Sequence, residues 1–127
     1  MNREFLTDGY YRTLVETYRE VINTYEKLNA ILSALDKEIS RLYHQLELCP
    51  VEELDSILFT SQLKDVLAKR RAIKDEKARI SPFYQLAQEA VDEIEKRHRR
   101  TISRTLKNQI KSPYTAWDVA EELGVLI

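Results

Sequence analysis

The chain has 127 residues, 32% of them charged, and a formal net charge of only −1. Two glycines and three prolines are too few for a turn-rich β fold, and this length fits one domain with a modest core. The single cysteine cannot form an internal disulfide, no stretch resembles a signal peptide, and no apolar run of about 18 residues occurs. We therefore expect one all-α domain, located in the cytoplasm and without a membrane segment.

Apolar residues recur at alternating spacings of four and three in the first third of the chain. The ten positions are Leu14, Tyr18, Val21, Tyr25, Leu28, Leu32, Leu35, Ile39, Leu42 and Leu46. This repeat predicts one helix over about residues 10–48 with a coiled-coil seam. Burying each large side chain stabilises by about 1.5–3 kcal/mol, which exceeds any helix propensity, so a partner helix must cover the seam.

A second helical arm is expected over residues 50–111. Cys49-Pro50 ends the first helix, and Pro50 is expected to begin the next one, because a proline has no amide hydrogen to donate. The arm begins with Leu54, Ile57, Leu58 and Leu63, and its seam continues through Val66, Arg70, Ile73, Lys77, Ile80, Tyr84, Ala87, Val91, Ile94 and His98. Because Arg70, Lys77 and His98 interrupt the apolar pattern, we expect a second copy of the chain to complete the packing as a homodimer.

Ser81-Pro82 leaves two interpretations of the second arm open. Ser81 caps a new helix that starts at Pro82, or Pro82 kinks one long helix at a cost of about 3 kcal/mol. The third proline pair, Ser112-Pro113, ends the arm in both cases.

Residues 113–127 predict a short terminal helix. Thr115 and Asp118 have the spacing of a capping box, and Gly124 is placed to close the helix. The stretch resembles the first helix and turn of helix-turn-helix domains, but no recognition helix follows it. We expect a small cap that docks on the long helices through its apolar residues, which are Trp117, Val119, Ala120, Leu123 and the tail Val125, Leu126 and Ile127.

Residues 96–111 carry seven basic side chains and no acidic ones, and this set is called the basic face below. Its members are Lys96, Arg97, Arg99, Arg100, Arg104, Lys107 and Lys111. Ile102, Leu106 and Ile110 form an apolar stripe beside them, which predicts an amphipathic helix. If the chain turns near residue 49, the first arm reaches back only to about residue 88 and leaves some twenty residues unpaired.

The charge distribution gives the basic face three interpretations. Residues 1–62 hold six basic and eleven acidic side chains, whereas residues 63–111 hold fourteen and seven. The favoured interpretation is a solvated face that meets the acidic arm of its own chain or of a second subunit. The alternatives are phosphates of DNA or RNA, contacted mainly by Arg97, Arg99, Arg100, Arg104, Lys107 and Lys111, and an acidic protein partner.

Three tyrosines, Tyr11, Tyr18 and Tyr25, are seven residues apart and therefore share one helix face. They pack in the seam of a dimer, or they form a stripe that recognises a partner protein, since tyrosine is enriched at interfaces.

Catalytic and metal-binding patterns are weak throughout the chain. Glu95 and His98 have the three-residue spacing of di-iron bundles, but the first arm offers no inward carboxylate to complete such a site. Cys49 has no base partner evident in the sequence. We therefore expect no catalytic residue, no metal and no cofactor.

The segment Lys69-Arg70-Arg71-Ala72-Ile73-Lys74-Asp75-Glu76 follows the long heptad helix. Over about residues 14–84 the chain resembles small coiled-coil proteins of unknown function from phages of Gram-positive bacteria. The resemblance implies a phage origin and a host cytoplasmic location, and it carries over no functional residue. Together these patterns predict a long antiparallel helical hairpin, dimeric, that acts as a non-catalytic protein-binding or assembly module, with a nucleic-acid-binding accessory protein as the alternative.

Overall fold

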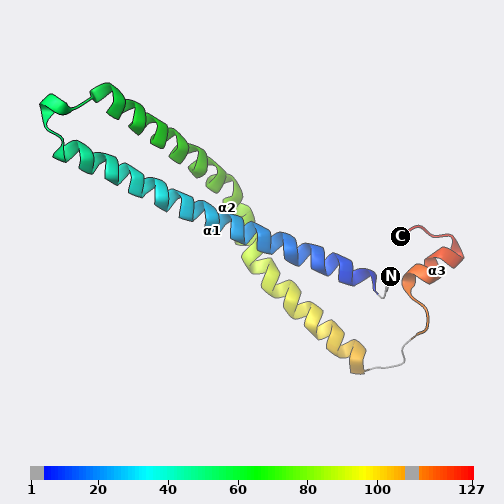
Figure 1. Cartoon of the computed structure of the whole chain (residues 1–127). Helices are drawn as coiled ribbons and strands as arrows, with labels where there is room; N and C mark the ends of the chain where they lie inside the picture. The colour runs from blue at the N-terminus through cyan, green and yellow to red at the C-terminus, as the bar shows by residue number, and fades with distance from the viewer. Residues whose placement is uncertain (1–4, 108–111) are drawn as a thin grey trace. The chain divides into compact units, whose positions relative to one another are not determined.

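The computed structural model describes residues 5–107 and 112–127, with side chains given for all of these except residues 105–107. Four elements follow in chain order: α1 (Leu6–Leu48), the short 3-10 helix η1 (Val51–Glu53), α2 (Ser56–Lys107) and α3 (Ala116–Leu123) (Figure 1). No β-strand occurs in these described ranges, which confirms the all-α prediction.

The chain divides into two units, which are treated separately. Unit 1 comprises Met1–Glu20 and Leu86–Ile127, and unit 2 comprises Val21–Gln85. Each unit contains part of α1 and part of α2, and the two long helices contact one another inside each unit.

The seam predicted for α1 is covered over most of its length. Nine of the ten predicted positions are buried or half-buried, and Leu42 is only 1% exposed. The exception is Leu14, which is exposed, while its neighbour Val15 is buried instead. The helix also starts at Leu6, about one turn before the predicted residue 10.

The turn between the long helices uses more residues than the sequence suggested. Pro50 does not begin α2; it precedes η1, and Leu54 then adopts an extended conformation. Asp55 accepts the amide hydrogen of Leu58 with its side chain at 3.0 Å, the arrangement of an N-cap residue, and α2 follows at Ser56. The carboxylate therefore determines where α2 begins.

The seam of α2 follows the predicted repeat from Val66 to His98. All ten positions are buried or half-buried, including the three polar ones. Upstream of Val66, Leu54 and Leu63 are half-buried as predicted, but Ile57 and Leu58 are exposed and Phe59 is half-buried in their place. Counting back from Val66 by three and four leads to Leu63 and Phe59, so the same repeat extends to the start of the helix.

Pro82 lies inside α2, which continues through it as one helix. The alternative in which Ser81 caps a separate helix is therefore wrong. Pro82 is exposed and so is Ala78, whose carbonyl would receive the missing hydrogen bond. Water can reach that carbonyl, which reduces the cost of retaining the proline.

Contacts between α1 and α2 reach further than the predicted residue 88. In unit 1 Arg19 pairs with Glu95, and the ring of Tyr11 stacks on His98. Two differences account for the longer pairing: α1 starts earlier than expected, and the turn occupies residues 49–55 rather than a point near residue 49. The predicted overhang of some twenty residues is therefore wrong.

The terminal helix α3 has the predicted ends. Thr115 and Asp118 form the complete capping box, and Gly124 closes the helix in the left-handed conformation with φ of 70°. Trp117 and Ala120 are half-buried, whereas Leu123 is 71% exposed and Leu126 is fully exposed, so docking of α3 on the long helices stays a prediction.

Candidate functional site

The three polar residues in the α2 seam each meet a specific residue of α1. Arg70 donates its Nε hydrogen to Oδ1 of Asp36 at 2.7 Å. Lys77 places its ammonium 5.5 Å from the ring centroid of Tyr25. These residues were the reason to expect a second chain in the seam, but their partners lie in the same chain.

His98 is also accommodated inside unit 1. Its ring lies parallel to Tyr11, with centroids 3.7 Å apart and planes 8° apart, and its Nε2 is 3.9 Å from Asp8. Glu95, the other member of the suspected metal pair, binds Arg19. Among residues 5–107 and 112–127, no group of three His, Cys, Asp or Glu side chains is placed to hold a metal ion.

The tyrosine stripe packs against α2 of the same chain. Tyr11 stacks on His98, and Tyr25 stacks on Tyr84 with centroids 3.8 Å apart. Tyr18 is half-buried as well. These positions favour packing within the chain over recognition of a partner by Tyr11, Tyr18 and Tyr25.

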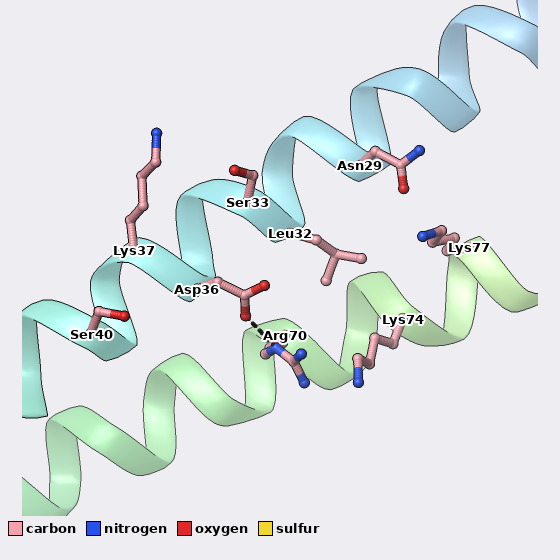
Figure 2. A pocket seen from close by; sticks show the side chains of 9 residues that line it. All are labelled: Asn29, Leu32, Ser33, Asp36, Lys37, Ser40, Arg70, Lys74 and Lys77. Atoms are coloured by element: carbon pink, nitrogen blue, oxygen red, sulfur yellow. Dashed lines mark hydrogen bonds and ion pairs between the residues drawn. The ribbon is translucent and has the colours of Figure 1, made fainter.

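A shallow groove runs beside the seam in unit 2 (Figure 2). It is lined by Asn29, Leu32, Ser33, Asp36, Lys37, Ser40, Arg70, Lys74 and Lys77. In Figure 2, Leu32 points toward α2, whereas Lys37 extends away from it. Since Arg70 is bound to Asp36 and Lys77 lies over Tyr25, the cations do not converge on a common point that an anion could occupy.

The described part of the basic face is exposed to solvent. Arg97 donates to Glu93 at 2.7 Å, and this bond lowers the pKa of the Glu93 carboxyl below its ordinary value. Arg99, Arg100 and Arg104 make no hydrogen bond or salt bridge to any residue that the structure describes. Lys111 lies outside the described residues, as does the side chain of Lys107.

The predicted apolar stripe beside the basic face is described only at Ile102. This side chain is 43% exposed, so it is not covered as an amphipathic helix face in a core would be. Leu106 and Ile110 fall outside the described side chains.

Sequence reasoning missed an exposed apolar group around the turn between α1 and α2. This group, called the turn patch, consists of Leu48, Val51, Ile57 and Leu58, each more than half exposed. Strict continuation of the heptad from Val66 would have indicated it, because the repeat includes Phe59 and excludes both Ile57 and Leu58.

In comparisons with known proteins, no family model, no curated protein and no solved structure matches this chain. Within the described ranges, no helix has both the length and the apolar character that crossing a lipid bilayer requires.

Proposed function

We propose that the chain is a non-catalytic assembly module, built on an antiparallel helical hairpin and associating with a second copy of itself. The contacts inside unit 2 support this topology, because Tyr25 meets Tyr84 whereas Asp36, later in α1, meets Arg70, earlier in α2. A hairpin of this kind satisfies its own seam and presents its outer faces to partners.

The observation that carries the proposal is the turn patch. Leu48, Val51 and Ile57 are 69%, 84% and 83% exposed, although burial of such side chains is worth about 1.5–3 kcal/mol each. Clustered exposed apolar side chains are typical of protein interaction surfaces. If the resemblance to phage proteins reflects the origin of the chain, a host or phage protein would be a further partner.

Sedimentation equilibrium of the purified chain tests this function. At tens of micromolar we expect a dimer or higher assembly, seen as a measured mass well above the 15.0 kDa of the monomer. A monomer throughout that range would contradict the proposal. Leu42→Asp, which buries an unpaired charge, serves as the reference for loss of the fold itself.

A nucleic-acid-binding accessory function is a second candidate, favoured by the exposed cations of the basic face. Arg97, Arg100 and Arg104 recur at spacings of three and four, so they share one side of α2. A phosphate backbone bound along this side would give affinity that falls steeply with salt.

The triple variant Arg97→Gln, Arg100→Gln and Arg104→Gln separates the two functions. If the basic face binds protein, the variant weakens assembly, and wild type retains no mixed-sequence DNA or RNA at about 150 mM salt. If it binds phosphates, wild type binds with micromolar affinity or better, and the salt slope of the variant falls by about 0.9 per lost contact. The matched control replaces three exposed cations elsewhere on α2, Lys64, Arg71 and Arg79, by Gln.

A further inference from the structure

The charged side chains next to the turn patch in the sequence are all acidic. From Leu42 to Leu63 the chain has no Lys or Arg, and its acidic residues are Glu47, Glu52, Glu53 and Asp55. All four are exposed, and none forms a salt bridge with a residue that the structure describes. The surface around the turn therefore combines exposed apolar side chains with uncompensated negative charge.

The basic face has the complementary chemistry at the far end of α2. Arg99, Arg100 and Arg104 are exposed and form no hydrogen bond or salt bridge with a residue that the structure describes, and Ile102 is exposed beside Arg99. The spacing of Arg97, Arg100 and Arg104 continues in the sequence to Lys107 and Lys111, although both lie outside the described side chains. Two surfaces of opposite charge, each with exposed apolar atoms, thus exist on one chain.

A second copy of the chain can supply the complementary surface for each region. The turn patch and its acidic neighbours belong to unit 2, and Arg99, Arg100 and Arg104 belong to unit 1. The opposite charges of these two regions therefore select a second copy as the partner.

We propose that the turn region of one chain, residues 42–63, docks on the exposed cations Arg99, Arg100 and Arg104 of a second copy. The opposite charges bring the two regions together and align them, and the turn patch then buries its apolar side chains against the partner. Each copy carries both surfaces, so two copies can form the contact twice in a symmetric pair. The proposal rests on the proposed assembly function and names the surfaces that perform it.

Charge reversal in two separate variants tests the pairing. One variant carries Glu52→Lys and Glu53→Lys at the turn, and the other carries Arg100→Glu and Arg104→Glu on the basic face. Each variant alone places like charges opposite one another at both contacts, so we expect its self-association to weaken about tenfold or more. In an equimolar mixture the two variants can pair with each other. The new lysines at the turn of one variant then meet the new glutamates on α2 of the other, and the second contact has the wild-type acidic turn against wild-type arginines.

We therefore expect the mixture to recover an association constant within about threefold of wild type by sedimentation velocity. Failure of the mixture to recover would overturn the proposed pairing. The control pair Glu76→Lys and Glu89→Lys reverses two exposed charges outside the turn and should leave association within about twofold of wild type. An equal loss in this control would show that net charge, not the named surfaces, controls association.

A second experiment tests the apolar part of the contact without altering charge. Val51→Ser and Ile57→Ser remove two side chains that are exposed in the isolated chain, so the fold should be retained, and we expect at least about tenfold weaker association. Phe83→Ser is the matched control, since Phe83 is also exposed and belongs to unit 2 but lies far along α2 from the turn. Unchanged association of the double variant would overturn the docking surface while leaving self-association intact, whereas a monomeric wild type would overturn the assembly function as well.

Discussion

Arg70 occupies a position in the α2 seam where the repeat calls for an apolar side chain, and it donates a hydrogen bond of 2.7 Å to Asp36 on α1. Its side chain is 31% exposed and that of Asp36 is 54% exposed, so water screens the pair. Partly exposed ion pairs contribute about 0–1 kcal/mol. An apolar side chain at position 70 should therefore stabilise the folded chain more than this ion pair does.

We predict that Arg70→Leu raises the free energy of unfolding by about 0.5–1 kcal/mol, because leucine continues the apolar seam between Val66 and Ile73. Asp36→Ala alone should lower it by no more than about 1 kcal/mol. Urea denaturation followed by circular dichroism measures both changes. A loss of more than about 2 kcal/mol in Arg70→Leu would mean that the pair determines the register of the helices.

The Tyr25–Tyr84 stack gives the second prediction. Both rings are half-buried between the helices, and Lys77 adds a cation–π contact to Tyr25. Tyr25→Ala should lower the free energy of unfolding by about 2–3 kcal/mol, since it removes ring burial and stacking together. Tyr43→Ala, which truncates a tyrosine that is 52% exposed on the same helix, is the control and should cost less than about 1 kcal/mol. An equal loss of stability in Tyr25→Ala and Tyr43→Ala would show that the stack adds nothing beyond what an exposed tyrosine on the same helix contributes.

The sequence predicted the α2 seam well because a single repeat determines it. Between Val66 and His98 the spacing of four and three never changes, so each covered position follows from the previous one, even where the residue is Arg70 or Lys77. What the sequence could not provide was the partner of each polar residue. Those partners depend on the alignment of α1 against α2, which the unexpectedly long turn shifts.

The α1 seam was predicted less well at its N-terminal end. Leu14 and Val15 are both apolar, so composition alone does not say which of them is covered. The covered positions run from Val15 to Tyr18 and then to Val21, which makes two successive spacings of three where the repeat has three and four alternating. Such an irregularity is invisible when every candidate residue is apolar.

The candidate sites show the same limit. Exposure of Arg97, Arg99, Arg100 and Arg104 could be predicted from their charge, and the structure agrees. The turn patch does not follow from composition, because Ile57 and Leu58 are as apolar as seam residues, and only the repeat counted back from Val66 to Phe59 excludes them from the seam. Apolar residues at a turn do not reveal by themselves whether they are covered.

Pro82 gives the third prediction. It interrupts the hydrogen-bond ladder of α2 at an exposed position, so replacing it should restore one bond and lose little packing. Pro82→Ala should raise the free energy of unfolding by about 1–3 kcal/mol, observed as a higher thermal midpoint by circular dichroism. Phe83→Ala, next to it and also exposed, should change stability by less than about 0.5 kcal/mol. A less stable Pro82→Ala variant would show that the proline favours the folded state through a contact or a bend.

The capping box of α3 gives the last prediction, which concerns pH. Oδ2 of Asp118 accepts hydrogen bonds from the amide of Thr115 at 2.9 Å and from its hydroxyl at 3.0 Å, and these bonds lower the pKa of the carboxyl below its ordinary value of 3.8. The folded helix thus binds the proton less readily than the unfolded segment does. Stability from this group is therefore fully present above the ordinary pKa and is lost as pH falls through the lower, folded one.

We expect α3 to retain its cap from neutral pH to about pH 4 and to fray progressively below that. Trp117, the only tryptophan in the chain, lies in the first turn of α3 and reports the change by its fluorescence. Asp118→Asn removes the titrating group and should abolish the transition, while Glu122→Gln, an exposed acid in the same helix, should leave it in place. With excitation selective for Trp117, persistence of the transition in Asp118→Asn would show that a different group controls the helix at low pH.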